Sequence, residues 1–261
     1  MTCAHPQRAD ALSKFAEPPS EKNQLVLEHL KDAQQITGTC AFVTGKVRAS
    51  AHFAFIGIAG HVNEAKFTKV VWHEVLRLGH FLVATKHRAL VFRPIGAGAY
   101  VEAYADSSNA PPGDMRRSPG GYLLRLTNGV INSAPFAWKS TWPRKPHHAS
   151  SGGELEQFLR CTKAALGVQI FFREAHFGYL VKSPTPVHTD ANVVLDGTHC
   201  RRVSSQSKCI ATNYAMVRQA ELDGAIIAVK CASEDNPADI LTKPLTGASF
   251  ARAEDLIMGR V

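Results

Sequence analysis

Tyr100-Val-Glu-Ala-Tyr-Ala-Asp106, followed by Gly121-Tyr-Leu-Leu-Arg-Leu-Thr127 and by residues 130–139, is the stretch that decides the fold. The first two segments have the composition and alternation of strands. Asn128-Gly129 between the second and third segments favours a two-residue hairpin turn, because both residues tolerate a left-handed backbone. The sequence therefore predicts three consecutive antiparallel strands.

The pattern after these strands changes to a helical period. From Gly152 onward one face of a helix is formed by Leu155, Phe158, Leu159, Thr162 and Leu166. A short strand is then predicted to end at Asp190, followed by a helix over 209–222 and an apolar strand over 225–231. This order of elements indicates an α/β fold in which a mixed sheet carries helices on its faces.

A last helix is predicted to open near Asn236. Asn236 suits the cap, Pro237 the first helical position and Asp239 the third. Upstream of the strands, residues 67–82 have apolar side chains at helical spacing with basic residues between them, which predicts an amphipathic helix. A solvated surface is the ordinary explanation of its basic face, and a nucleic-acid track is the alternative.

Composition restricts the class of protein without naming a function. The chain is 45% hydrophobic and 20% charged, which is typical of one or two globular domains, and its formal charge of +8 favours a polyanionic partner. Six scattered cysteines form no zinc-binding pattern and are expected to be free thiols in a reducing compartment. No apolar run is suited to cross a membrane, so we expect the cytosol or the nucleus.

Four acidic residues lie at the ends or beginnings of predicted elements: Asp106, Glu154, Asp190 and Asp239. Each has an ordinary structural explanation as a turn residue, a helix cap or a partner of the helix dipole. If the fold brings them together, however, their mutual repulsion calls for cations, and oxygen ligands suit Mg²⁺ or Mn²⁺. Two such ions about 4 Å apart are able to clamp the attacking and leaving oxygens of a phosphodiester. Spacing in the sequence does not show that the four residues converge.

Motifs around these positions carry a family resemblance. They are Val101-Glu-Ala-Tyr-Ala-Asp106, Arg116-Arg-Ser118 with Gly121-Tyr122, Trp138-Lys-Ser140, Ala149-Ser-Ser-Gly-Gly-Glu154, Thr189-Asp190 and Asn236-Pro-Ala-Asp-Ile-Leu-Thr-Lys-Pro-Leu245. Together they resemble the ribonuclease H region of copia-type retrotransposon polyproteins, and the last of them is the most specific. The resemblance implies a ribonuclease H-like fold with a five-stranded mixed sheet flanked by helices.

The resemblance also implies an activity, which is metal-dependent cleavage of the RNA strand of an RNA–DNA hybrid. Two Mg²⁺ ions, or Mn²⁺ in their place, would be held with Asp106 bridging them, Glu154 and Asp190 completing one shell and Asp239 supporting the other. Candidate contacts to the nucleic acid are Lys139, Ser140, Ser150, Ser151, Arg116 and Arg117, of which the two arginines are equally well explained as loop charges.

The predicted domain organisation has a ribonuclease H-like domain over residues 98–247. Residues 1–34 are expected to be a loose lead-in, and residues 248–261 a C-terminal helix or tail. Residues 35–97 faintly resemble the end of a reverse transcriptase and its connection helix. Because the chain has no adjacent pair of aspartates for a polymerase metal site, we expect no DNA synthesis.

Departures from the family pattern keep a second hypothesis open. Ser107 and Ser108 follow Asp106 where the family usually has Ala-Asp, and Gly152-Gly153 replace Glu-Ala before Glu154, which weakens the helix start by about 1 kcal/mol per glycine. The alternative is therefore a catalytically inactive nucleic-acid-binding remnant of a retroelement. A poorly folding fragment of a decayed element is a third hypothesis.

Overall fold

The computed structural model describes residues 29–96, 98–108, 118–143, 150–181, 184–199 and 211–260. Within them the chain begins with helices α3 (Leu30–Lys46), α4 (His52–Ala59) and α5 (Lys69–Ala84). The hydroxyl of Thr68 caps α5 by accepting a hydrogen bond from the Val71 backbone N–H, which fixes its first turn. The helix predicted over residues 67–82 is therefore confirmed. Most of the lead-in predicted over residues 1–34 lies outside the described residues, although α3 already begins at Leu30.

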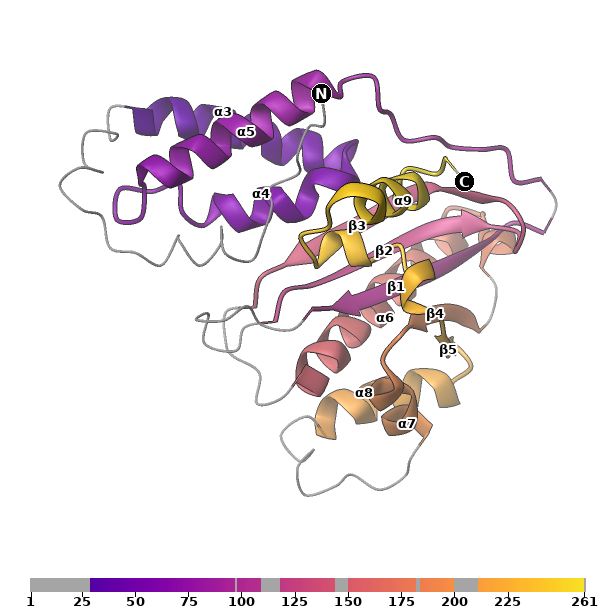
Figure 1. Cartoon of the computed structure of the whole chain (residues 1–261). Helices are drawn as coiled ribbons and strands as arrows, with labels where there is room; N and C mark the ends of the chain where they lie inside the picture. The colour runs from indigo at the N-terminus through magenta and orange to yellow at the C-terminus, as the bar shows by residue number, and fades with distance from the viewer. Residues whose placement is uncertain are drawn as a thin grey trace.

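The centre of the molecule is a five-stranded sheet with the order β3-β2-β1-β4-β5 (Figure 1). Its strands are β1 (Tyr100–Ser107), β2 (Gly120–Thr127), β3 (Asn132–Thr141), β4 (Thr185–Thr189) and β5 (Ile226–Lys230). The pairs β1–β2 and β2–β3 are antiparallel, whereas β4 pairs with β1 and β5 with β4 in parallel. This mixed sheet confirms the predicted α/β architecture of a ribonuclease H-like fold.

One face of the sheet is covered by helices α6 (Ser150–Glu174), α7 (Asn192–His199) and α8 (Ala211–Leu222). Alternate residues of β1, including Val101 and Ala103, point into this layer and share a core with Leu155 and Phe158 of α6. The helical face predicted from the sequence thus packs on the sheet as expected.

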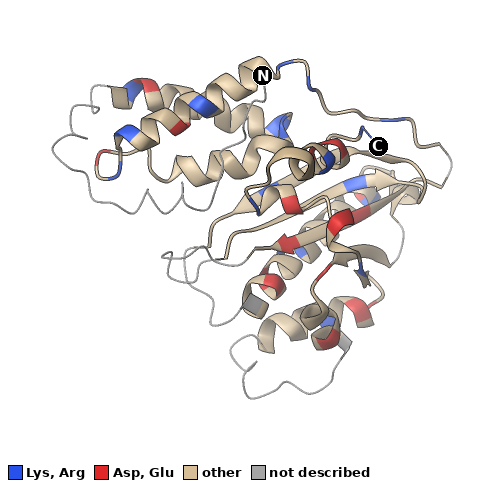
Figure 2. Ribbon diagram, viewed as in Figure 1, with Lys and Arg blue, Asp and Glu red and all other residues tan. Residues whose placement is uncertain are grey.

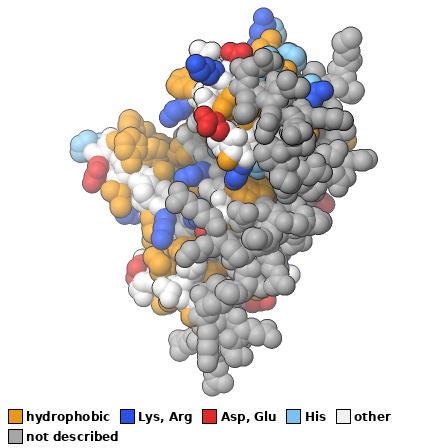
Figure 3. All heavy atoms as spheres, turned by 90° about the vertical axis from the view of Figure 1, so that its left-hand side faces the viewer, with side chains coloured by type: hydrophobic (Ala, Val, Ile, Leu, Met, Phe, Trp, Pro, Cys, Tyr) orange, Lys and Arg blue, Asp and Glu red, His pale blue; other side chains and the backbone are white. Residues whose placement is uncertain are grey.

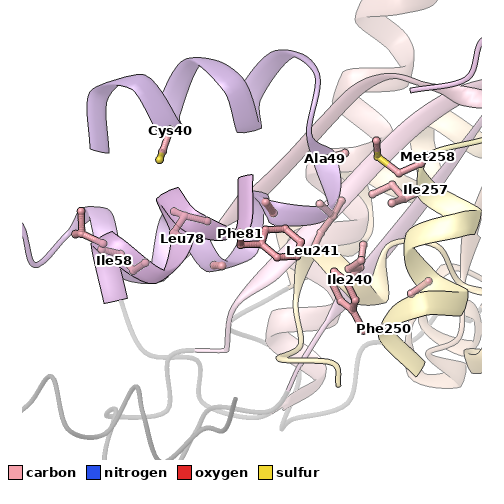
Figure 4. Close-up of a cluster of buried hydrophobic side chains, with 14 of the residues drawn as sticks. Cys40, Ala49, Ile58, Leu78, Phe81, Ile240, Leu241, Phe250, Ile257 and Met258 are labelled. Carbon is pink, nitrogen blue, oxygen red and sulfur yellow. The ribbon is translucent and has the colours of Figure 1, made fainter. Parts of the chain in front are cut away.

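The opposite face of the sheet is covered by the N-terminal helices and by α9 (Gly247–Ile257). Tyr104 of β1 and Leu123 of β2 contribute to this second core, together with Ile240 and Leu241 near the C-terminus (Figure 4). The indole N–H of Trp138 on β3 also donates to the carbonyl of Thr44 on α3, at 2.9 Å. Helices α3 to α5 therefore share buried surface with the sheet. The domain boundary predicted at residue 98 stays a prediction.

The helix predicted to open at Asn236 is wrong in kind, because the structure has a single 3₁₀ turn, η7 (Asp239–Leu241). Asn236 does not cap it, because the N-cap residue is Ala238; the Asn236 side-chain oxygen instead accepts from the Ala238 backbone N–H at 3.1 Å, just ahead of the turn. Pro244 provides the physical reason for the early end, because it has no N–H to donate and disfavours helical backbone at the preceding residue. The longer helix, α9, starts only at Gly247.

Seen from the side of α3 to α5, the described surface shows hydrophobic side chains with Lys and Arg between them (Figure 3). Phe42 is 70% exposed and Val83 is 68% exposed in these helices. In the described part of the chain, no helix combines the length and the apolar character that crossing a bilayer requires.

Candidate metal centre

Three aspartates meet at one edge of the sheet. Asp106 is the last residue but one of β1, and an acidic position is seen at the tip of this strand (Figure 2). Asp190 directly follows β4, which lies beside β1 and runs parallel to it. Because adjacent parallel strands end at the same edge, both carboxylates arrive at the same place.

The third aspartate, Asp239, is brought to this edge by the 3₁₀ turn η7. The Asn236 side-chain amide donates to the backbone carbonyl of Ala105 at 3.2 Å, which fastens the turn to β1. On β2, Gly121 lies opposite Asp106 and leaves the space that the turn occupies, since a Cβ there would lie 2.6 Å from Leu241 Cβ. Asp106, Asp190 and Asp239 each offer one oxygen, and these oxygens all lie within 4.8 Å of one another.

Glu154, the fourth predicted ligand, lies next to this group but is not one of its three members. It is the fifth residue of α6 and is partly buried. Its carboxylate accepts a hydrogen bond from the Ser107 backbone N–H and senses the charges of Asp106 and Asp190. The structure therefore places all four acids in one neighbourhood, with three in direct reach of a shared cation.

The electrostatics of the cluster favour a cation. Burial, together with the neighbouring carboxylates of Asp239 and Asp190, raises the pKa of Asp106 to about 6, although Lys243 opposes the shift. Burial and the charges of Asp106 and Asp190 raise the pKa of Glu154 to about 8, and burial likewise raises the pKa of Asp239. Repulsion between buried carboxylates costs free energy, and positive charge placed among them recovers it.

Several hydrogen-bond donors around the aspartates were not assigned a role from the sequence. Thr242 donates its hydroxyl proton to Asp106 Oδ2, and Ser233 donates to Asp190 Oδ2. The ammonium group of Lys243 contacts both Asp239 and Asp106. Thr242 and Lys243 follow Asp239 by three and four residues, and that spacing within one turn was a usable signal for them.

The predicted nucleic-acid contacts fall in different environments. Lys139 is exposed, whereas Ser140 is only 4% exposed and its hydroxyl has no hydrogen-bond partner among the described residues. Ser151 is half-buried, and the side chain of Ser150 lies outside the described part. Arg116 and Arg117 also lie outside the described residues. Ser140 pairs with Gly121, which pairs with Asp106, so it lies two strands, or roughly 10 Å, from the cluster.

Comparison with known proteins identifies relatives among plant transposons. No family model matches the chain. The retrovirus-related Pol polyprotein from transposon TNT 1-94 of Nicotiana tabacum is 23% identical over 186 residues, which are 71% of this chain and 13% of that protein. The corresponding polyprotein from transposon RE2 of Arabidopsis thaliana is 25% identical over 180 residues, 69% of this chain and 12% of that protein. The chain thus spans about an eighth of the length of these relatives.

Solved structures with a similar arrangement include cellular and viral proteins. LC11-RNase H1, isolated from compost, has a TM-score of 0.40 at 14% identity and covers 55% of this chain and 92% of its own. The N-terminal RNase H domain of a Mycobacterium tuberculosis protein has a TM-score of 0.40 at 13% identity and covers 60% of this chain and 98% of its own. A foamy viral protease-reverse transcriptase in complex with dsDNA has a TM-score of 0.43 at 14% identity and covers 87% of this chain and 42% of its own. From its sequence matches and its strand order, the chain is homologous to a segment of the retrovirus-related Pol polyproteins of plant transposons and contains a ribonuclease H-like sheet.

Proposed function

We propose that this protein is a divalent-metal-dependent endonuclease that hydrolyses the RNA strand of RNA–DNA hybrids at the cluster of Asp106, Asp190 and Asp239, with Glu154 beside them. The observation that supports this most directly is the meeting of three aspartate oxygens within 4.8 Å, from segments far apart in the sequence. A chance cluster of surface acids would not bury one member to 1% exposure, as Asp106 is.

The donor set fits a hard divalent cation. All of the groups are carboxylates, and no His is a member of the group of possible ligands within the described residues. Such a set suits Mg²⁺ or Mn²⁺ better than Zn²⁺. A bound divalent ion supplies a Lewis acid for a phosphoryl oxygen and lowers the pKa of water. The protein itself holds the ligands in place, through the sheet, the hydrogen bond from the Asn236 side chain to Ala105 and the hydroxyls of Thr242 and Ser233.

The choice of an RNA–DNA hybrid as substrate rests on homology and charge. The relatives are retrovirus-related Pol polyproteins, and the chain carries a formal charge of +8 that favours a polyanion. Contacts to the 2′-hydroxyl would separate RNA from DNA, and contacts to backbone phosphates would hold either strand, both without reading bases. We therefore expect cleavage with little base preference, leaving a 5′-phosphate and a 3′-hydroxyl.

The test is cleavage of an end-labelled RNA–DNA hybrid in Mg²⁺ by the purified chain. Asp239→Asn and Asp106→Asn should each lower the rate by about 100-fold or more, because loss of even an outer-shell partner typically costs 10–100-fold. Asp235→Asn is the matched control, since this nearby aspartate is 63% exposed and pairs with Arg252 away from the cluster. The control should cleave like the wild type.

The inactive remnant makes a different prediction in the same assay. It would bind the hybrid, in a gel-shift or anisotropy measurement, without cutting it, and Asp106→Asn would change nothing. A chain with no cooperative thermal transition would contradict both hypotheses and would support the poorly folding fragment.

A further inference from the structure

Lys243 places a positive charge inside the acidic cluster. Its Nζ lies 2.8 Å from Asp239 Oδ1 and 3.4 Å from Asp106 Oδ2. The turn η7 and Pro244 set this position, because the helical backbone ends after one turn. Lys243, four residues after Asp239, therefore lies on the same side of that turn as Asp239. Two of the three converging aspartates thus already share a cation that belongs to the chain.

The carboxylate oxygens divide into two sets. One oxygen of each aspartate accepts from the protein: Asp106 Oδ2 from Thr242, Asp190 Oδ2 from Ser233 and Asp239 Oδ1 from Lys243. The other oxygens, Asp106 Oδ1, Asp190 Oδ1 and Asp239 Oδ2, accept from no N–H group or hydroxyl of the described residues, although the carboxyl groups of Asp106 and Asp239 also hydrogen-bond to each other when one of them is protonated. Three oxygens are therefore left for an added cation, which suffices for one ion completed by water but leaves few ligands for another.

We infer that Lys243 is a built-in cation that takes the place of a second metal ion, so that the cluster binds one divalent ion tightly and a second only when the ammonium group is displaced. This inference rests on the proposed function, because it assumes that the aspartates bind a divalent ion. It differs from the two-ion arrangement that the sequence resemblance implies.

Charge accounts for the limit of one ion. With all four carboxylates ionised, the ammonium group and one divalent ion leave a single net negative charge in the neighbourhood. A second divalent ion would reverse the sign and would stand within a few ångströms of the ammonium group, and like charges at that distance repel strongly in a poorly solvated site. Removing the charge of Lys243 should remove this barrier.

The experiment is a titration of the metal-free full chain with Mn²⁺. Binding is measured by isothermal titration calorimetry and by the electron paramagnetic resonance signal of free Mn²⁺. We expect one tight site in the wild type. In Lys243→Met we expect two sites, with the first at least about 10-fold tighter, because a competing charge is gone. Lys243→Gln serves as a second uncharged variant should the methionine variant not fold, and Lys243→Arg should keep one site.

Lys230→Met is the matched control. This lysine also contacts the cluster region, but its ammonium group donates to the backbone carbonyl of Asp190 and to no carboxylate of the three. Its loss removes the same charge and should leave one Mn²⁺ site. Two tight sites in the wild type, or the same number and affinity in Lys243→Met as in the wild type, would overturn the inference while leaving the proposed function standing. No Mn²⁺ binding by any variant would overturn both.

Discussion

Gly121 has no side chain at a place where the turn η7 rests on the sheet. An added Cβ would lie 2.6 Å from Leu241 Cβ and 3.2 Å from Thr242 Cγ2, and the first of these distances is too short for two carbon atoms. Thr242 is the residue whose hydroxyl bonds Asp106. The absence of one methyl group therefore controls how closely Asp239, Thr242 and Lys243 approach the end of β1.

Gly121→Ala should push this turn away from the sheet. We expect a loss of about 1–3 kcal/mol in the free energy of unfolding, as for other overpacked sites, and weaker Mn²⁺ binding, because Asp239 moves with the turn. Urea unfolding and Mn²⁺ titration measure the two effects. Gly38→Ala is the control, since Gly38 lies inside α3 with nothing within 4 Å of an added Cβ, and it should gain up to about 1 kcal/mol. Equal effects of the two substitutions would contradict the role given to Gly121.

The elements themselves were largely predictable, because their signals are local. The alternation of residues 100–106 and the run 121–127 fix β1 and β2, and the helical period after Gly152 fixes α6. The two-residue turn predicted at Asn128-Gly129 is wrong: residues 128–131 form the loop and β3 begins at Asn132, because the Asn128 side chain accepts hydrogen bonds from the backbone N–H groups of Val130 and Ile131. The signals at Asn236 and Pro237 predict where a helix starts but not its length, and Pro244 ends the helical backbone after the single turn η7. The meeting of Asp106 with Asp190 was not derivable from spacing, since it depends on parallel pairing of β1 with β4 across a long crossover. Family resemblance indicated it, and the sheet brings it about.

Helix α9 is fastened to the N-terminal helices through a buried carboxylate. Glu254 is 2% exposed and contacts Arg88, with Arg48 at 3.9 Å and Arg260 at 3.7 Å, and it accepts a hydrogen bond from Ser50 at 3.1 Å. Arg48 is itself buried and donates to Thr85 at the end of α5. One acidic side chain thus connects α9 with the segment between α3 and α4 and with the end of α5.

Glu254→Gln should destabilise the protein by about 3 kcal/mol or more, because it leaves the buried Arg48 without its acidic partner. Chemical denaturation measures the change, and its m-value should stay unchanged if only the native contact is lost. The neighbouring Asp255→Asn is the control, because Asp255 is 46% exposed and its one ion pair among the described residues is with Arg260, and it should stay within about 0.5 kcal/mol of the wild type. A similar loss of unfolding free energy in both variants would contradict the role given to Glu254.

The molecule as a whole should lose stability as pH rises when metal is absent. The pKa of Asp106 is raised from 3.8 to about 6 and that of Glu154 from 4.5 to about 8, in both cases first by burial. The folded state therefore binds more protons than the unfolded chain, and this contribution to stability is lost as pH rises through these raised values. In a chelator, the Tm should be lower at about pH 8 than at about pH 5, by about 2–4 °C per kcal/mol lost.

Mg²⁺ should restore more of the Tm at the higher pH, because the ionised carboxylates bind it. Asp106→Asn should flatten the pH dependence in the chelator and should weaken the response to Mg²⁺. Scanning calorimetry at the two pH values measures both. A metal-free wild type whose Tm does not change over this range would contradict the raised pKa values.

Because helices α3 to α5 share a core with the sheet, the described chain should unfold as one unit. Phe81 and Leu78 of α5 belong to the same buried cluster as Leu123 of β2 and Ile240. We expect a single calorimetric transition whose van't Hoff enthalpy equals the calorimetric enthalpy. Two separated transitions would instead support an independent domain that begins at the predicted boundary, residue 98.

The hydrogen bond from Thr242 to Asp106 joins residues 136 positions apart. During translation Asp106 therefore lacks its partners Asp239, Thr242 and Lys243 until the ribosome has added these residues. A nascent chain, or one released too early by a stop codon or a frameshift, carries Asp106 and Asp190 without the residues that complete their surroundings. Under the proposed function, such a product would lack a complete site for cutting nucleic acid, however well its earlier strands had folded.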